Sequence, residues 1–422
     1  MSGKRIVFAT FGSLGDLYPY VAVARELAGR GHRPLIATFG EYRETVEAAD
    51  VGFAPMRPDM GGFGDKTAIM ERLVDPRRGP QFMVRGMFMP HLRESYEDLA
   101  RACRGADLLV THPLTFAGPL LAEKEGLPWA STALSPMTQF SAFDPPLFPA
   151  ASWMRWMRKL GVGAYRLVFR IPRAIVRRWE EPLRVFRAEL GLRPTEALAQ
   201  FEGQYSPRLH LALFSSVLAA PQPDWPANTV ICGFPRYDGA PPDARRQSEL
   251  EAFLAAGEPP LVFGLGSSAV MIAGVFWRAA IEASQALGRR ALLLTGSGAG
   301  LGTLPSTIKA FDYLPYSAVF PRAAAIVHSA GIGTLAQALA AGRPQLVVPV
   351  AFDQPDNARR AVALGLARGI PFKKASGRAM ARALDALLAA PAYASCARKI
   401  GEWVTHEDGA RNAAAALEPV AA

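Results

Sequence analysis

The sequence has few cysteines, no long apolar run and no low-complexity or repeated segment. Its 422 residues include three cysteines, Cys103, Cys232 and Cys396, which lie far apart and match no metal-ligand spacing. This pattern predicts free thiols in a reducing compartment. No stretch reaches the roughly 18–20 apolar residues that a spanning helix needs, and the first residues do not read as a signal peptide. We therefore expect a cytoplasmic protein.

Acidic residues are also scarce in one region, and this shortage explains much of the net charge of +10. Between Ala151 and Arg187 there are ten Lys/Arg, and the only acids are Glu180 and Glu181. Arginines alternate there with large apolar residues at roughly helical spacing. Such a segment can lie on an anionic membrane, here the inner membrane face, or meet an anionic amphiphile. The alternative is a solvated helix face over a core. No motif for nucleic acid accompanies the charge, so we expect no nucleic-acid partner.

The chain length predicts two domains, and both halves alternate short apolar strands with helical patterns. We therefore expect two α/β domains, each with a doubly wound parallel sheet. Prolines gather between Ala219 and Arg245 and indicate a linker. Gly61–Pro90, rich in Gly, Pro and Met, is expected to be an irregular loop. The predicted division is a first domain over 1–220, a linker over 221–245, a second domain over 246–400, and a segment over 401–422 that can return to the first domain.

The stretch VHSAGIGTLAQALAAGRPQLVVPVAFDQPDN (Val327–Asn357) places polar groups after two apolar runs. His328 ends the first predicted strand, Gly331 and Gly333 allow a tight turn, and a helix opens near Thr334. The free N–H groups of a helix start favour phosphate, and His328 could donate to a phosphate oxygen. Asp353 and Gln354 follow the next strand. Carboxylate and amide groups read sugar hydroxyls, so the combination suits a sugar nucleotide.

A dinucleotide site is the rival interpretation of this stretch. Gly331-x-Gly333-x-x-Ala336, with Asp353 about 20 residues on, also matches the nicotinamide-dinucleotide fingerprint. Three features count against it: the motif opens late in the second domain, His328 would crowd the turn, and Gln354 and Asn357 have no role in it. The glycine-rich Gly296–Gly302 lacks the third glycine at the fingerprint spacing and is expected to be a plain loop.

The first half begins with a comparable turn. Gly12, Ser13 and Gly15 follow the first predicted strand, and Asp16 stands at the turn before a helix expected from about Pro19. Asp16 can be a helix cap or a base in a cleft. Gly266–Ser268 after another strand form a second small-residue turn, which either cradles phosphate or is unremarkable.

These motifs resemble the nucleotide-sugar glycosyltransferases of the GT-B fold over nearly the whole chain. The residues that carry the resemblance are FGSLGDLYPYVAVARELAGRGHRP near the start and YLPYSAVFPRAAAIVHSAGIGTLAQALAAGRPQLVVPVAFDQPDNARRAVALGLA in the second half. PDWPANTVICGFPRYDG and the length look most like rhamnosyltransferases that glycosylate hydroxy-fatty-acid lipids. Sterol and macrolide glycosyltransferases share the GSxGD opening. The resemblance implies two facing Rossmann-like domains with a cleft between them.

Residue roles follow from the resemblance motif by motif. Asp16 would be the catalytic base, because the first loop has no histidine of the kind that plant-type enzymes use. His328-Ser329-Ala330-Gly331 departs from the usual His-Gly-Gly pattern. The resemblance implies a nucleotide and diphosphate site of Ser267, Tyr313, Leu314, Pro315, His328, Ser329, Gly331, Gly333 and Thr334, with Asp353 and Gln354 on the sugar and Gly12, Ser13 and Gly15 in the first loop.

The acceptor is expected to be apolar and to bind the first domain. Methionines and aromatics in its predicted loops form an adaptable apolar surface, and Met83, Met87, Met89 and Phe140 are the expected wall residues. The alternative is that they belong to the core.

The expected reaction is inverting transfer of rhamnose or glucose from a TDP- or UDP-sugar to a hydroxyl of a hydroxy-fatty-acid lipid. A sterol, macrolide or polyketide acceptor is the alternative. No Asp-x-Asp motif is present, so we expect no metal and no cofactor. A nicotinamide-dependent dehydrogenase and a non-catalytic sugar-nucleotide binder remain as other classes.

Overall fold

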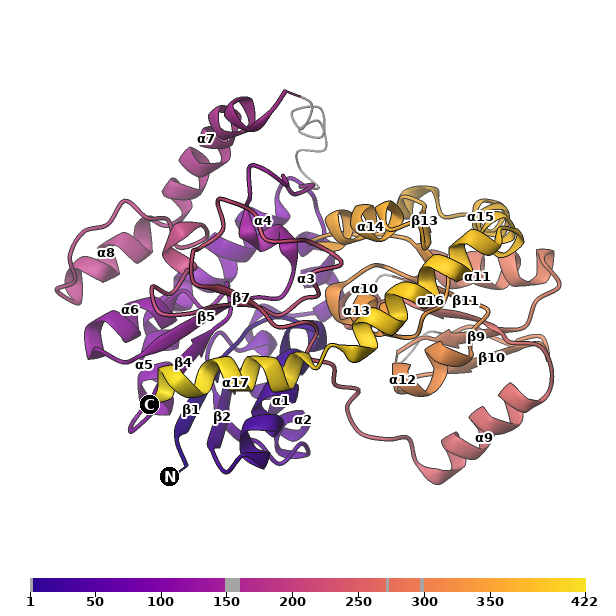
Figure 1. Cartoon of the computed structure of the whole chain (residues 1–422), viewed down its shortest axis with the longest axis horizontal. Coiled ribbons are helices and arrows are strands. Elements are labelled where there is room, and N and C mark those ends of the chain that lie inside the picture. Colours follow the sequence, from indigo (N-terminus) through magenta and orange to yellow (C-terminus); the bar gives the residue numbers. More distant parts are fainter. Residues whose placement is uncertain (1–2, 149–159, 271–272, 297–299) are drawn as a thin grey trace. The chain divides into compact units, whose positions relative to one another are not determined.

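The computed structural model describes residues 3–148, 160–270, 273–296 and 300–422, and it divides into two compact units. Unit 1 comprises residues 1–237 together with 408–422, and unit 2 comprises residues 238–407 (Figure 1). Each unit is built on one sheet whose described strands pair in parallel. The predicted fold class, two α/β domains with parallel sheets, is confirmed.

The sheet of unit 1 has seven strands in the order β3-β2-β1-β4-β5-β6-β7. Its strands are β1 (Arg5–Ala9), β2 (Arg33–Thr38), β3 (Gly52–Pro55), β4 (Leu108–Thr111), β5 (Trp129–Ala133), β6 (His210–Ala212) and β7 (Thr229–Ile231). Its helices are α1 (Leu14–Gly29), α2 (Arg43–Glu47), α3 (Lys66–Leu73), α4 (Gly79–Gln81), α5 (Leu92–Ala102), α6 (Ala117–Glu125), α7 (Val162–Trp179), α8 (Glu181–Glu189) and α17 (Gly409–Ala421).

The sheet of unit 2 has six strands in the order β10-β9-β8-β11-β12-β13. Its strands are β8 (Leu261–Gly264), β9 (Ala291–Leu294), β10 (Ile308–Phe311), β11 (Ala325–His328), β12 (Gln345–Val347) and β13 (Ala367–Gly369). Its helices are α9 (Ala244–Ala255), α10 (Gly266–Ala269), α11 (Gly274–Ala286), α12 (Tyr316–Val319), α13 (Ile332–Ala340), α14 (Gln354–Ala363), α15 (Gly377–Ala389) and α16 (Pro391–His406).

The central strands are apolar without interruption because both faces of each sheet are covered. In β8, for example, Leu261 and Phe263 point into the core beneath α11 and α15, whereas Val262 packs into the opposite core with residues of α9 and α13. This alternation with a period of two residues is the geometry of a strand buried on both sides. It fixes the register of the strands, and therefore the positions at which their loops begin.

The structure corrects two local expectations and adds a short strand to the predicted linker. Gly61–Pro90 is mostly helical rather than irregular: after α3 and α4, a π-helical segment spans Phe82–Phe88, and its apolar residues pack on the core of unit 1. The proline-rich stretch contains the short edge strand β7, and the boundary between the units falls at Tyr237–Asp238. Helix α1 begins at Leu14 rather than near Pro19, because Ser13 caps it.

The segment α17 belongs to unit 1 although unit 2 precedes it in the chain. It packs against α1, where Arg30 binds Glu418 (Nη1–Oε2, 3.1 Å) and the Arg411 carbonyl. Its first residue, Gly409, lies so close to the backbone of Phe234 that an added Cβ would come within 2.3 Å of the Phe234 carbonyl carbon. The chain therefore crosses from one unit to the other twice.

Candidate active site

The order of the strands places one ligand-binding edge in each unit. In unit 1 the order reverses between β1 and β4, and in unit 2 it reverses between β8 and β11. The loops that leave the carboxyl ends of two such strands diverge to opposite faces, and the crevice between them is where open α/β sheets bind ligands. Asp16 follows β1, and the turn from His328 to Thr334 follows β11, so both predicted motifs lie at these points.

Asp16 is held at the start of α1 by a reciprocal cap. Its Oδ2 accepts hydrogen bonds from the Ser13 backbone N–H (2.8 Å) and the Ser13 hydroxyl (3.2 Å), while the Ser13 hydroxyl accepts from the Gly15 N–H. Gly12 has a φ of 131°, and an added Cβ there would come within 2.3 Å of Asp16 Oδ2. The turn thus requires glycine next to the carboxylate. The Asp16 side chain is still 33% exposed.

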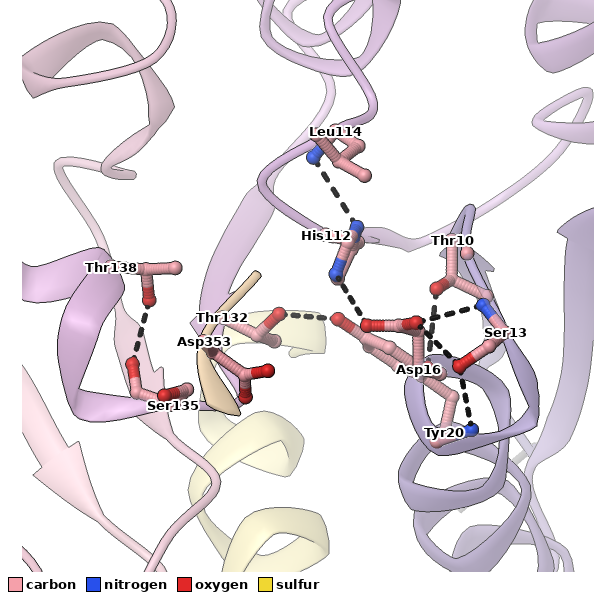
Figure 2. A network of polar contacts seen from close by, with 12 residues as sticks. Thr10, Ser13, Asp16, Tyr20, His112, Leu114, Thr132, Ser135, Thr138 and Asp353 are labelled. Atoms are coloured by element: carbon pink, nitrogen blue, oxygen red, sulfur yellow. Dashed lines mark hydrogen bonds and ion pairs between the residues drawn. The ribbon is translucent and has the colours of Figure 1, made fainter. Parts of the chain in front are cut away.

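A histidine that the sequence analysis missed faces the other oxygen of this carboxylate. His112 follows β4, the neighbour of β1, and its Nε2 lies 3.7 Å from Asp16 Oδ1 (Figure 2). Its Nδ1 accepts a hydrogen bond from the Leu114 N–H (3.2 Å). The neutral ring therefore carries its proton on Nε2, directed at Asp16. Only the order of the strands could have predicted this pair, because His112 and Asp16 are far apart in the sequence.

Beside these residues unit 1 has a small, mainly apolar cavity. Phe11 from the end of β1 and Leu114 and Thr115 from the loop after His112 contribute to its wall. The complete lining is Phe11, Met56, Phe88, Leu92, Ser95, Leu114, Thr115, Phe116 and Ala117. An apolar hollow next to a partly exposed carboxylate suits an apolar molecule that carries a hydroxyl.

The four expected wall residues do not line this cavity. Met87 is buried, Met89 belongs to the core of unit 1, and Met83 packs against that core. Phe140 packs in a separate aromatic cluster with Phe169 and Phe201. The structure thus places all four in packing positions, which was the alternative interpretation. The aromatic and methionine-rich stretch Trp153–Met157, which we also expected to contribute to the acceptor surface, lies outside the described residues.

In unit 2 the start of α13 provides unpaired backbone donors. Its N-cap, Gly331, makes no side-chain cap, and this leaves the first N–H groups of a nine-residue helix directed beyond β11. The turn before it is made at Ala330, whose φ is 64°, rather than at the glycines. The Ser329 hydroxyl donates to the Leu265 carbonyl (2.7 Å), and this bond ties the turn to the β8 loop. A Cβ on Gly266 would lie 3.0 Å from Thr334 Oγ1, so the Gly266–Ser267 turn and the α13 start are adjacent.

His328 is fully buried, and both its ring nitrogens are used within the protein. Nδ1 accepts from the Ala330 N–H (3.1 Å), and Nε2 lies 3.0 Å from Gln345 Oε1. Burial lowers the pKa of His328 to about 4, so the ring is neutral near pH 7 and Nε2 donates to Gln345. The predicted contact with a phosphate oxygen would require one of these bonds to break. In this structure the His328 ring stabilises the turn at Ala330 through these two hydrogen bonds.

Asp353 and Gln354 begin α14, and Asn357 links them to the α13 turn. Gln354 Oε1 accepts from the N–H groups of Val350 and Ala351, which fixes the loop after β12. The amide of the fully buried Asn357 donates to Asp353 Oδ2 (2.7 Å) and to the Ala330 carbonyl (3.0 Å). The loops after β11 and β12 are therefore joined by hydrogen bonds. The sequence placed both loops at the same edge of the sheet, but it did not show that Asn357 links them.

The segment Tyr313–Pro315 precedes α12 at the same sheet. Leu314 is buried in the core, and the Tyr313 ring is partly exposed with its hydroxyl donating to the Asp238 carbonyl. The Asp238 carboxylate in turn accepts from Gln337 (2.7 Å) and from the Ser317 N–H (3.0 Å). Tyr313 thus has a fixed position from which its ring face could meet a base.

Comparison with known proteins agrees with this geometry. Residues 6–139 match the glycosyltransferase family 28 N-terminal domain, and residues 291–416 match the C-terminal domain of erythromycin biosynthesis protein CIII-like proteins. The O-mycaminosyltylonolide 6-deoxyallosyltransferase of Streptomyces fradiae is 34% identical over 98% of this chain and 97% of its own. A sterol 3-beta-glucosyltransferase of Arabidopsis thaliana is 28% identical over 98% of the chain, which spans 65% of that relative.

Solved structures share the fold at lower identity. The glycosyltransferase of kitacinnamycin has a TM-score of 0.71 at 21% identity, covering all of both chains. The spinosyn rhamnosyltransferase complexed with thymidine diphosphate has a TM-score of 0.69 at 18% identity, covering 98% of this chain and all of its own. Two parallel-sheet units of this topology define the GT-B class of fold. The chain belongs to the nucleotide-sugar glycosyltransferases of that class, the family that contains the macrolide deoxyallosyltransferase.

Proposed function

We propose that this protein transfers a deoxyhexose, with inversion and without a metal ion, from a TDP-sugar to a hydroxyl of an apolar acceptor. The observation that carries the proposal is the partly exposed carboxylate of Asp16, held between Ser13 and His112 beside an apolar cavity. A base in that position has apolar residues of the cavity wall near it, among them Phe11 and Leu114. Capping alone would not need the second contact, from His112.

In the proposed step, Asp16 accepts the proton of the acceptor hydroxyl. The hydroxyl oxygen forms a bond to the anomeric carbon as the bond from that carbon to the diphosphate oxygen breaks, and the nucleoside diphosphate leaves with the electron pair. A carboxylate is a weak base, so proton transfer is late, after much of the positive charge has developed at the sugar. Each carboxylate oxygen has two lone pairs, which leaves room for the acceptor beside the bonds to Ser13.

His112 acts as a positioning residue in this scheme. Its Nδ1 is occupied by the Leu114 N–H and its Nε2–H faces Asp16, so neither nitrogen is available as the base. The ring instead orients Oδ1 of Asp16. The distance of 3.7 Å between His112 Nε2 and Asp16 Oδ1 is expected to shorten to that of a hydrogen bond when the substrates bind. Contacts of this kind are commonly long in unliganded enzymes.

The leaving diphosphate would be stabilised by backbone donors rather than by a cation. The uncapped N-terminus of α13 supplies N–H groups and the positive end of a helix dipole. Ser267 and Thr334 lie at the adjacent turns and would add hydroxyl donors. Asp353 and Gln354 would read the sugar hydroxyls.

The relatives support the choice of donor and acceptor without deciding it. A deoxyallosyltransferase of a macrolide is the relative matched at 34% identity, and a neighbouring fold was solved with thymidine diphosphate. We therefore rank a macrolide or sterol acceptor ahead of a hydroxy-fatty-acid lipid, and a TDP-deoxysugar such as TDP-rhamnose ahead of a UDP-glucose donor.

The test combines binding and turnover. TDP should raise the melting temperature more than UDP, and NAD should not raise it. A ligand at 100 times its Kd adds about 2.7 kcal/mol to the free energy of unfolding. TDP-rhamnose should then be consumed with a macrolactone, a sterol or a 3-hydroxy-fatty acid, with equal turnover in excess chelator, and the product should have the inverted anomeric configuration.

Three results would count against the proposal. Stabilisation by NAD instead of TDP would favour a dehydrogenase. Complete loss of turnover in chelator would contradict the metal-independent step. Tight binding of TDP-sugars with no transfer to any acceptor of the panel would favour a non-catalytic binder.

A further inference from the structure

Helix α7 has two apolar faces, although only one of them has a partner within the described residues. Tyr165, Phe169 and Val176 are buried against the aromatic cluster that includes Phe201. Leu167, Ile171 and Ile175 are 64%, 61% and 47% exposed. Because an α-helix turns once every 3.6 residues, these three are stacked along one side, opposite the buried residues. Packing on the core accounts for the apolar face of Tyr165, Phe169 and Val176, but not for the exposed apolar face of Leu167, Ile171 and Ile175.

Exposed apolar side chains concentrate around this helix. More than half of the large exposed hydrophobic residues in the described part of the chain lie between Phe143 and Val185. They include Leu160 just before the helix and Phe143, whose ring lies 5.7 Å from the Arg166 guanidinium carbon. Isolated exposed hydrophobics are normal, whereas several of them along one side of a helix are typical of an interaction surface.

The charge of the helix selects the partner. α7 contains five arginines and no acidic residue. Arg173 pairs with Glu202, and Arg177 pairs with Glu196 at 2.6 Å. Arg170 and Arg178 are exposed and form no ion pair with any residue that the structure describes. A second copy of this face would bring the same arginines together, so self-association is disfavoured.

We propose that this face of α7 docks on an anionic lipid bilayer, with Leu167, Ile171 and Ile175 in the interfacial layer and the arginines at the level of the headgroups. This arrangement is that of an amphipathic helix lying in the membrane plane. No described helix is long and apolar enough to cross a bilayer, so the contact is peripheral. The inference is independent of the transferase proposal, because it concerns binding alone.

The structure also changes which arginines should be tested. Arg173, Arg177 and Arg178 would be the obvious set from the sequence, but the first two are engaged with glutamates. The informative charge variant is Arg170→Gln with Arg178→Gln. The informative apolar variant is Leu167→Ser with Ile171→Ser. Both change exposed side chains only, and TDP binding should be unchanged in both.

The experiment is flotation of the full chain with vesicles of phosphatidylcholine alone or mixed with phosphatidylglycerol, at low and high salt. Binding is expected only to the mixed vesicles and should weaken in salt. Neutralising the two arginines should weaken it roughly tenfold, since each basic residue near an anionic surface contributes up to ~1 kcal/mol. The double serine variant should lose binding at both salts. Arg104→Gln and Val275→Ser, exposed residues elsewhere, are the matched controls and should bind as the parent does.

Failure to float with anionic vesicles would overturn the proposal. So would equal binding to neutral vesicles, or binding that the serine variant retains. Concentration-dependent dimers in sedimentation, lost in the serine variant, would instead assign the face to a second copy of the chain.

Discussion

The two units share a strand order around their switch points, yet they present different chemistry there. At the β1–β4 edge of unit 1, a partly exposed carboxylate is directed away from the core by Ser13, Gly12 and His112. At the β8–β11 edge of unit 2, the polar side chains are turned inward: His328, Ser329, Gln354 and Asn357 are buried and bonded within the unit. There these side chains hold the backbone, and the backbone N–H groups at the start of α13 are left uncapped.

Under the proposed function, this contrast separates catalysis from binding within one fold. A proton acceptor must be a side chain with an accessible lone pair. Such a side chain is partly exposed, so it can be substituted without disturbing the core. A diphosphate is satisfied by N–H groups at a helix start, and those need only a rigid frame. Variants of unit 1 should therefore change rate, and variants of unit 2 should change affinity and stability.

Asp16→Asn should give the largest effect. Removing the base is expected to lower kcat about 10²–10⁴-fold, with little change in the affinity for TDP. Ser13→Ala is the matched control, because it removes the hydroxyl of the cap, at about 1 kcal/mol of stability, and keeps the carboxylate. Steady-state kinetics and TDP titration check both. An equal fall in kcat for the two variants would mean that Asp16 only caps the helix.

His112→Gln should lower kcat by a smaller factor, about tenfold, because the base remains and only its orientation is lost. KM for the donor should be unaffected. The variant also lacks the Nδ1 acceptor for Leu114. His112→Asn can accept at that position but has no donor that reaches Asp16, so it should not recover the rate. A rate equal to that of the parent in both variants would remove His112 from the mechanism.

Asn357→Ala should act on binding and stability. It leaves the Ala330 carbonyl and the Asp353 carboxylate without their buried donor, which typically costs about 1–3 kcal/mol. Thermal unfolding should occur at a lower temperature and TDP should bind more weakly, while kcat at saturating donor falls less than in Asp16→Asn. If kcat collapsed with TDP affinity intact, the division of roles between the units would be wrong.

The last prediction concerns stability alone, as a function of pH. Burial lowers the pKa of His210 to about 3 and that of His328 to about 4, below the usual 6.5. A lowered pKa means that only the unfolded chain takes up these protons between pH 6.5 and about 4, so the folded state loses stability as pH falls. The slope is about 1.4 kcal/mol per pH unit for each such group. Denaturant unfolding from pH 7 to 4.5 should show it, and His210→Gln should make the slope shallower. A flat profile in the parent would contradict the buried, neutral state.

Much of the fold was predictable because the central strands are recognisable in the sequence as short apolar runs. The segments that form β1 and β11 are apolar runs in the sequence, and the turns that follow them fix the places of Asp16 and Thr334. The three-residue strands β6, β7 and β13 carry a weaker signal, because so short a run cannot be told from a loop without its neighbour.

The site was less predictable where tertiary pairing decides it. His112 joins Asp16 only through the β1–β4 register, which no local pattern contains. His328 has the sequence position of a ligand, but its ring turns to Gln345 across the β11–β12 pair. The helical Phe82–Phe88 segment carries glycine and follows proline, signals that usually mark loops, and its packing on the core overrides them.

The return of α17 to unit 1 has a practical consequence for recombination between relatives. Unit 2 is inserted into unit 1 rather than following it, since the chain leaves at Tyr237 and comes back at Asp408. A chimera that exchanges unit 2 therefore needs two splice points, one at each crossing. A single splice would combine the α17 of one parent with the α1 and Phe234 surfaces of another, at a contact where Gly409 tolerates no side chain. By the same topology, a protease that cuts one crossing would leave the two units joined through the other.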